Sequence, residues 1–416
     1  MRTSKTIATT IGGLAALIAV LGATPVRAED EAPTDPTRGQ WDSFLDPLRD
    51  FEDNTVTEGQ KWVEEKSKIH VSAAFQKGFT YDFGGPKQGT PLPYDGFLYH
   101  NSPSIDAAQL KMTRPGEGWF IPGFGLTLDF GKIARRIKSD WSGNGAVTRG
   151  DIFETNNFDA QDVYLTWTVP EESPYLKGLS VKGGKFATLL GAEVIEPWLN
   201  FNNSRSLIYT FAIPVTNTGV LLSYPVTDKI TVTGGPVVGW DNVPTNNNGW
   251  SGMGGVSWAA CDQLSLAVNG IYGPSQNNDV GNKRSVVDLI ATYKPVPELT
   301  LQANYDWGHE QDAALTGGTA TWQGISMIAN YAFTDRFSGA VRGGWFEDPN
   351  GARTGVDHNS VYEGTFDLKY LITQHLYVQT EFRFDKSSQD VFLADANKQL
   401  KGNHGLIGAN LTYVFN

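Results

Sequence analysis

Apolar and polar side chains alternate along most of this chain, and this two-residue period constrains the fold more than any other feature. Residues 375–386 show it in the run Val378-Gln379-Thr380-Glu381-Phe382-Arg383-Phe384-Asp385. Residues 123–131, 298–307 and 360–372 alternate in the same way. Successive side chains on a β-strand point to opposite faces, so each stretch predicts a strand with one apolar and one polar face. We expect about sixteen such strands after Lys68, in an all-β chain.

The linkers between these stretches decide between a barrel and a sandwich, because they alternate in length. Short linkers lie at 226–227, 295–297 and 373–374, and long linkers lie at 241–249, 273–283, 308–320, 347–359 and 387–402. A closed antiparallel barrel in an outer membrane has tight turns at one end and longer loops at the other. A soluble β-sandwich would show the same alternation along its strands, but it has no reason to place every long loop at one end.

The placement of aromatic residues agrees with a membrane barrel. The tryptophans that border long linkers are Trp240, Trp250, Trp307, Trp322 and Trp345. The aromatic residues close to short linkers or to the C-terminus are Tyr224, Tyr293, Phe333, Phe337, Tyr370 and Phe415. Two belts at opposite strand ends are typical of the two membrane–water interfaces. The alternative is that these aromatic side chains form a core.

The first residues predict export of the chain. A basic start with Arg2 and Lys5 precedes an apolar run from Ile7 to Ala23, and small residues flank Arg27. This order is typical of a secretory signal peptide, which we place at residues 1–28. A retained membrane anchor is the alternative.

Residues 29–67 differ from both neighbours and form a separate predicted segment. Their apolar residues fall at helical spacing, as Trp41, Phe44, Leu45, Leu48 and Phe51. We expect a short, partly helical segment in the periplasm or inside the barrel, with Asp46 before Pro47 as a candidate helix cap. Disorder is the alternative. The barrel itself is predicted at residues 68–416.

Composition excludes several other classes of protein. A formal net charge of −12 argues against a nucleic-acid-binding surface. Cys261 is the single cysteine, so no internal disulfide framework can form, and we expect an exposed thiol between two strands. We also expect neither catalytic residues nor a metal or cofactor. The six histidines are scattered, and neither His-Glu-x-x-His nor Gly-x-Ser-x-Gly occurs. An outer-membrane hydrolase is a weak alternative.

Three stretches carry a resemblance to a known family. Residues 183–193, the tetrapeptide Asn203-Ser204-Arg205-Ser206 and the sequence around Thr218-Gly219-Val220 resemble the OmpL-like family of outer-membrane β-barrel porins. The last strand, residues 408–416, is similar to the terminal signal that outer-membrane barrels present to the barrel assembly machinery. The resemblance implies a bacterial outer-membrane barrel of the general diffusion kind.

A barrel of sixteen strands encloses a water-filled channel. The loop from Ala187 to Thr216 is the longest between paired strands, and in porins of this architecture such a loop folds into the barrel. We therefore predict a pore constriction formed by loop and wall residues, namely Glu193, Glu196, Arg205, Lys111, Lys182, Arg342, Glu381 and Arg383. An ordinary surface loop is the alternative.

These features predict passive diffusion of small hydrophilic solutes and ions through the outer membrane. An excess of acidic residues on the inward faces of the late strands predicts a mild cation preference. The alternative function is a structural or surface-interaction barrel whose pore is blocked by residues 29–67. Expected partners are the membrane lipid, the assembly machinery and the solutes, while the sequence leaves open whether the barrels form a homotrimer.

Overall fold

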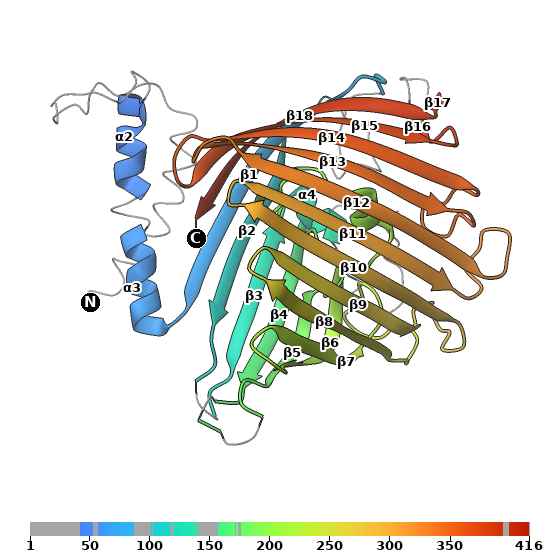
Figure 1. Ribbon diagram of the computed structural model, residues 1–416, viewed down its shortest axis with the longest axis horizontal. Coiled ribbons are helices and arrows are strands. Elements are labelled where there is room, and N and C mark those ends of the chain that lie inside the picture. Colours follow the sequence, from blue (N-terminus) through green and yellow to red (C-terminus); the bar gives the residue numbers. More distant parts are fainter. Residues whose placement is uncertain are drawn as a thin grey trace.

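The computed structural model describes residues 42–52, 57–86, 101, 103–117, 120–137, 139, 157–170, 172–173, 176–393 and 399–415. Sixteen antiparallel strands close into one barrel, in which each strand pairs with its neighbours in sequence and β1 pairs with β18 (Figure 1). A separate pair, β16 (Phe392–Leu393) and β17 (Leu400–Lys401), forms a small hairpin in the last long loop. The predicted fold class is therefore confirmed.

The barrel strands keep the bounds that the two-residue period predicts to within a few residues. They are β1 (His70–Asp82), β2 (Ser104–Arg114), β3 (Gly123–Phe130), β4 (Phe158–Thr168), β5 (Ser180–Ala187), β6 (Thr216–Pro225), β7 (Ile230–Val237), β8 (Ser251–Cys261), β9 (Leu264–Pro274), β10 (Lys283–Val296), β11 (Leu299–Glu310), β12 (Ala320–Ala332), β13 (Phe337–Asp348), β14 (Asn359–Leu371), β15 (Leu376–Ser387) and β18 (Asn403–Phe415). Cys261 is exposed at the end of β8, as expected.

Three of the short turns at one end of the barrel contain a threonine whose side chain hydrogen-bonds to the turn backbone. In three of them a threonine hydroxyl accepts two backbone N–H groups at 3.0–3.3 Å and so replaces the ladder bonds that end there. The three residues are Thr227, Thr334 and Thr373. Together with backbone hydrogen bonds across each turn, this side chain lets four residues reverse the chain between two strands. The long linkers named in the sequence analysis lie at the opposite end, but the linker 169–179 between β4 and β5 is also long and lies at the end with the short turns.

Two helices precede the barrel, α2 (Asp42–Phe51) and α3 (Glu58–Ser67). The Thr373 hydroxyl donates to the Glu52 carboxylate at 2.9 Å, and Gln60 donates to the carbonyl of Val71 at 3.1 Å. Both contacts lie at the end of the barrel with the short turns, and Figure 1 shows the helices beside that rim. The described part of residues 29–67 therefore does not enter the barrel.

The sequence interpretation of this segment is only partly correct. Asp46 lies inside α2, which continues through Pro47, so it is not the helix cap that we predicted. No described helix has the length and apolar character needed to cross a membrane. The predicted signal peptide at residues 1–28 and the remainder of residues 29–41 lie outside the described residues.

The outward face of the barrel is apolar, as predicted. Leu301, Phe366 and Phe382 are exposed on it, whereas Gln379, their inward-facing counterpart, is fully buried. The aromatic belt is more complex than the sequence indicates. Trp250 and Trp307 are exposed, but Trp240 and Trp322 point into the mouth of the barrel and stack edge to face with ring centroids 6.3 Å apart.

An arginine on the outward face should impair the folded barrel in the membrane. Phe382 lies near the middle of β15, and a Phe382→Arg substitution there is expected to cost about 2–4 kcal/mol, since the charge faces hydrocarbon. Ser257→Arg, on the exposed inward face of β8, is the matched control and should cost little. The measurement is the free energy of unfolding in lipid vesicles. Equal costs at the two positions would mean that the assigned faces are wrong.

The interior of the barrel is not uniformly polar, which corrects the expectation from the sequence. The chain between β5 and β6, residues 188–215, turns into the barrel, and we call it the inner segment. Its apolar side chains pack against inward-facing wall residues near the long-loop ends of the strands, among them Val237, Met253, Ile271, Val286, Trp322, Phe346 and Val361. The short helix α4 (Lys132–Ile137) joins the same core. The half of the barrel near the long loops therefore holds a hydrophobic core.

Candidate functional site

Glycines let the inner segment leave the wall. Gly184 has φ +134°, and a Cβ there would overlap the backbone of β4. Gly191 has φ +89°, and a Cβ there would lie 2.5 Å from Ile213, near the end of the segment. Only glycine adopts such a conformation and approach without strain. Glycine is therefore required at one position before the segment and at one position within it.

Hydrogen bonds within the inner segment also stabilise its conformation. The Glu193 carboxylate accepts the N–H of Ser206 at 3.0 Å, and the Arg205 guanidinium donates to the carbonyl of Ile195 at 2.6 Å. Ser206 caps the helix α5 (Leu207–Phe211) through the N–H of Tyr209. Burial raises the pKa of Tyr209 to about 12, so its phenol stays neutral. The inner segment is thus a defined structure and not a flexible loop.

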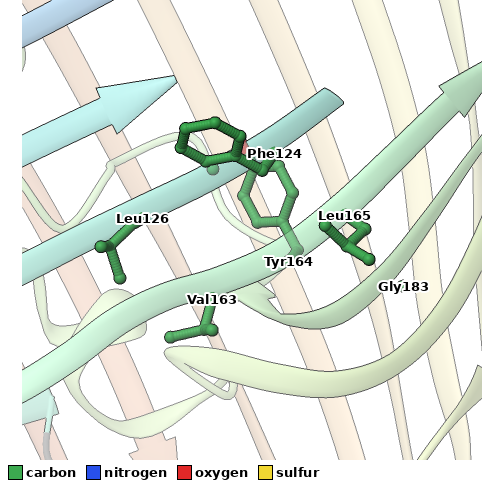
Figure 2. Close-up of a pocket in the computed structure, with 7 residues that line it drawn as sticks. Phe124, Leu126, Val163, Tyr164, Leu165 and Gly183 are labelled. Carbon is green, nitrogen blue, oxygen red and sulfur yellow. The ribbon is translucent and has the colours of Figure 1, made fainter. Parts of the chain in front are cut away.

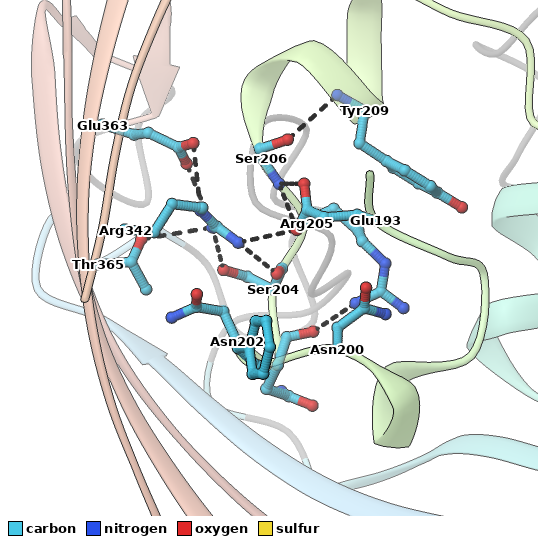
Figure 3. A network of polar contacts seen from close by, with 12 residues as sticks. Glu193, Asn200, Asn202, Ser204, Arg205, Ser206, Tyr209, Arg342, Glu363 and Thr365 are labelled. Carbon is cyan, nitrogen blue, oxygen red and sulfur yellow. Dashed lines mark hydrogen bonds and ion pairs between the residues drawn. The ribbon is translucent and has the colours of Figure 1, made fainter. Parts of the chain in front are cut away.

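Arg342 on β13 is the main link between the segment and the wall (Figure 3). Its guanidinium donates to the Ser204 carbonyl at 2.7 Å and to the Ser204 hydroxyl at 2.8 Å. It also forms ion pairs with Glu193 of the segment at 3.1 Å and with Glu363 of β14 at 3.2 Å. Arg342 is completely buried. A buried guanidinium with several acceptors fixes the geometry of both partners, because its planar donors have set directions.

Arg383 on β15 extends this network around the wall. It donates to the Arg205 carbonyl at 2.7 Å and forms an ion pair with Glu363 at 3.0 Å. It is also paired with Asp385 at 2.9 Å, and Asp385 contacts His404 on β18 at 2.8 Å. His404 in turn contacts Asp82 on β1 at 3.0 Å. Acidic and basic side chains of five neighbouring strands therefore form one continuous buried network.

Backbone amides of the segment bind a second group of wall carboxylates. The N–H of Asn203 donates to Asp367 at 3.2 Å, and the N–H of Ser204 donates to Glu381 at 2.9 Å. Gln379 donates to the Phe201 carbonyl at 3.2 Å. These wall residues face inward at matched positions on β14 and β15, since Asp367 pairs directly with Glu381. The segment thus crosses to the half of the barrel nearer the short turns.

The segment reaches the opposite wall at Glu196. Gln161 on β4 donates to the Glu196 carboxylate at 3.1 Å, and the Lys111 ammonium of β2 lies 3.9 Å from it. Between these contacts and those with β14 and β15, the segment spans the lumen. The side chains that it leaves exposed are apolar, with Val194 41% and Leu199 61% accessible. Its polar residues hold the walls, and apolar residues face the open part of the lumen.

The structure brings together most of the predicted constriction residues, but it gives them different environments. Glu193, Glu196, Arg205, Arg342, Glu381 and Arg383 are all buried where the segment meets the wall. Lys111 remains partly exposed beside Glu196, and Lys182 lies on β5, with its ammonium 4.7 Å from the ring centroid of Tyr164. The two-residue period places Asp367, Glu363 and Gln379 on the polar faces of their strands, but it does not reveal their contacts with the segment. It also missed Trp322, which donates to the Ala212 carbonyl at 3.1 Å.

A shallow pocket between β3, β4 and β5 is a separate feature (Figure 2). Phe124, Leu126, Val163 and Leu165 line it, and Val163 and Leu165 are exposed on the outward face. It is therefore a mostly apolar crevice on the outside of the barrel. It is not part of the lumen.

Comparison with solved structures finds the same barrel fold in other proteins. The chain resembles OprB of Pseudomonas putida, with 12% sequence identity, a TM-score of 0.55 and coverage of 88% of this chain and 97% of that one. It also resembles an anion-selective porin from Comamonas acidovorans, with 10% identity, a TM-score of 0.53 and coverage of 83% and 99%. OmpT of Vibrio cholerae in its trimer form gives 9% identity, a TM-score of 0.51 and coverage of 83% and 98%. No curated protein matches the chain in sequence.

A closed barrel of this size with a segment folded across its lumen defines a porin-type channel of the bacterial outer membrane. Residues 68–415 match the family described as "Putative beta-barrel porin-2, OmpL-like", and the chain belongs to that family. The chain is therefore an outer-membrane porin, a channel for passive diffusion. The family that the sequence motifs indicate is confirmed.

Proposed function

We propose that small hydrophilic solutes and ions diffuse past the inner segment, which is the constriction of this channel. The observation that carries the proposal is the attachment of the segment to both walls, through Arg342 and Glu196, at a depth where it narrows the lumen. Inward-facing side chains nearer the short turns stay exposed, including Ser257 and Ser265. Transport through such a channel follows the concentration gradient and needs no covalent step. We propose no catalytic role.

In this proposal, the charged side chains that act on a passing ion are the ones exposed to water in the lumen. The late-strand acids that led us to expect a cation preference are buried, namely Asp288, Asp306, Glu363, Asp367, Glu381 and Asp385. Two of them, Glu363 and Asp385, are paired with Arg342 or Arg383. Lys111 and Lys182 are more exposed than any of these acids. We therefore replace the cation preference with selectivity set mainly by these two lysines. A porin of similar fold from Comamonas acidovorans is described as anion-selective.

Reversal of one lysine charge should shift ion selectivity. Lys182→Glu is expected to move the reversal potential in a salt gradient towards that of a cation channel, since exposed charges near the constriction act within a screening length of about 8–10 Å. Asp367→Asn changes a buried charge and is the control, with a smaller expected shift. The measurement is the reversal potential of channels in a planar bilayer. A larger shift in Asp367→Asn than in Lys182→Glu would contradict the assignment.

The proposal also assigns a location to the N-terminal residues and to the barrel. We propose that residues 1–28 are removed on export, that residues 29–67 stay in the periplasm, and that the barrel begins at residue 68. The aromatic residue Phe415 ends β18, which supports recognition of this strand by the barrel assembly machinery. The exposed apolar outward face supports contact with lipid. The trimer form of the similar Vibrio cholerae protein supports a homotrimer.

A closed barrel with a structural role is the second candidate function. The apolar packing of the inner segment against inward-facing wall residues favours it, because this packing fills much of the lumen near the long loops. The blocking element would then be residues 188–215 and not residues 29–67. Channel conductance separates the two candidates.

A further inference from the structure

Two lysines and a tyrosine, Lys111, Tyr164 and Lys182, form a patch on the inner wall across β2 to β5, which we call the wall patch. In the strand register, Tyr164 lies between Gly125 of β3 and Gly184 of β5. A Cβ at Gly125 would overlap the tyrosine ring, so the ring lies over that glycine. Tyr164 is only half-buried. The wall patch therefore has a partly accessible aromatic ring at its centre, and glycines occupy both cross-strand positions beside it.

The two lysines carry the charge of the wall patch. The Lys182 ammonium lies 4.7 Å from the ring centroid of Tyr164 and 5.9 Å from that of Phe186, which are cation–π distances. Within the described part of the chain, Lys182 takes part in no ion pair. The Lys111 ammonium lies 3.9 Å from Glu196, and the lysine side chain is 35% accessible. Lys182 is therefore available to a passing anion, and Lys111 is partly so.

The inner segment brings apolar side chains to the same part of the lumen. Glu196, which contacts Lys111, lies between Val194 and Leu199 in the sequence. Both apolar residues are exposed, and Trp198 is half-buried. Water covers these apolar side chains inside the barrel, so their contact with an apolar part of a solute is favourable. The passage beside the wall patch therefore offers cationic, aromatic and aliphatic groups together.

We propose that the channel favours small organic anions with an apolar group, namely aromatic and short-chain monocarboxylates. This inference rests on the proposed diffusion function and names its class of solute. The lysines attract the carboxylate and raise its local concentration, while Tyr164 and Leu199 contact the ring or chain. Sites for small molecules commonly combine apolar surface with a few polar groups in this way. An inorganic anion uses only the lysines, and a neutral apolar solute uses only the apolar groups.

The test compares benzoate with acetate in planar bilayers that contain the full-length protein. A pore that discriminates by size alone passes acetate faster, because acetate is smaller and diffuses faster. The proposal predicts the opposite order, with a benzoate permeability about twofold or more above that of acetate. The measurement is the reversal potential with potassium benzoate on one side of the membrane and potassium acetate on the other.

Two substitutions separate the charged part of the passage from its apolar part. Lys182→Gln should lower the permeability of both anions relative to potassium, whereas Leu199→Ser should remove the advantage of benzoate over acetate. Lys229→Gln, in the exposed turn between β6 and β7, is the matched control for the lysine. Leu315→Ser, in the exposed loop after β11, is the matched control for the leucine. Both controls should behave like the native protein.

Binding is also measured without conduction, from the broadening of benzoate proton signals in NMR spectra when the detergent-solubilised protein is added. Leu199→Ser should broaden these signals less than Leu315→Ser does. A channel that conducts but passes acetate ahead of benzoate would overturn the inference and leave the diffusion function standing. An undiminished benzoate advantage in Leu199→Ser would do the same. A protein that does not conduct would refute the diffusion function, and equal broadening by the two leucine variants would then overturn the inference as well.

Discussion

Replacement of Arg342 by methionine is expected to detach the inner segment from the wall and to destabilise the protein by about 3–5 kcal/mol. The guanidinium contacts Glu193, Ser204 and Glu363 in a fully buried position. Methionine has a similar length but leaves the two carboxylates buried beside an apolar group. The free energy of unfolding measures the cost, and proteolysis of the segment in the folded barrel measures its release.

Arg342→Lys is the matched control for this prediction. It keeps the positive charge but lacks the planar donors that reach Ser204 and the acids together, so an intermediate loss is expected. Equal stability of the native protein and Arg342→Met would show that the buried network does not hold the segment. Protection of the segment from protease in Arg342→Met would lead to the same conclusion.

Removal of the inner segment is expected to have the largest effect on the channel. The N–H of Thr188 donates to the carbonyl of Val215 at 3.0 Å, so the two strands are still paired where the segment begins. A two-residue Asn-Gly turn in place of residues 189–214 can therefore close β5 and β6 as a hairpin. The lumen of a sixteen-stranded barrel without an inner segment is a wide aqueous channel, and conductance should rise several-fold.

A second shortened loop controls for the effect of the deletion itself. Residues 311–319 connect β11 and β12 at the same end of the barrel and are mostly exposed. A variant in which the loop of residues 311–319 is shortened should have a conductance close to that of the native protein. A similar rise in both variants would mean that damage to the loops, and not removal of a constriction, opens the channel.

The strands could be predicted from sequence because their physical cause is local. Alternate side chains along a strand point to opposite faces. This alternation placed Gln379, Glu381 and Arg383 inward and Phe382 outward, as observed. The length of the linkers then indicated a barrel. These arguments need only neighbouring residues, and tertiary contacts do not override them here.

The interior could not be predicted in the same way, because its contacts join distant parts of the chain. Residues 188–215 have no regular period, and Arg342 meets Ser204 across 138 positions. The alternation along a strand shows that a side chain faces the lumen. It does not show whether water or another part of the chain occupies the lumen beside that side chain. The late-strand acids consequently looked like pore charges, and Trp322 looked like an interfacial residue. The structure buries the acids and Trp322, and it places Asp367, Glu381 and Trp322 in contact with the inner segment.

Single-channel recording in planar bilayers tests the central claim, that this porin conducts through a lumen narrowed by the inner segment. The native protein should give discrete, small conductance steps, and replacement of residues 189–214 should enlarge them several-fold, while the shortened 311–319 loop should not. The claim would be contradicted if the native protein gave no conductance steps. It would also be contradicted if the native protein and the variant in which a turn replaces residues 189–214 gave steps of equal size.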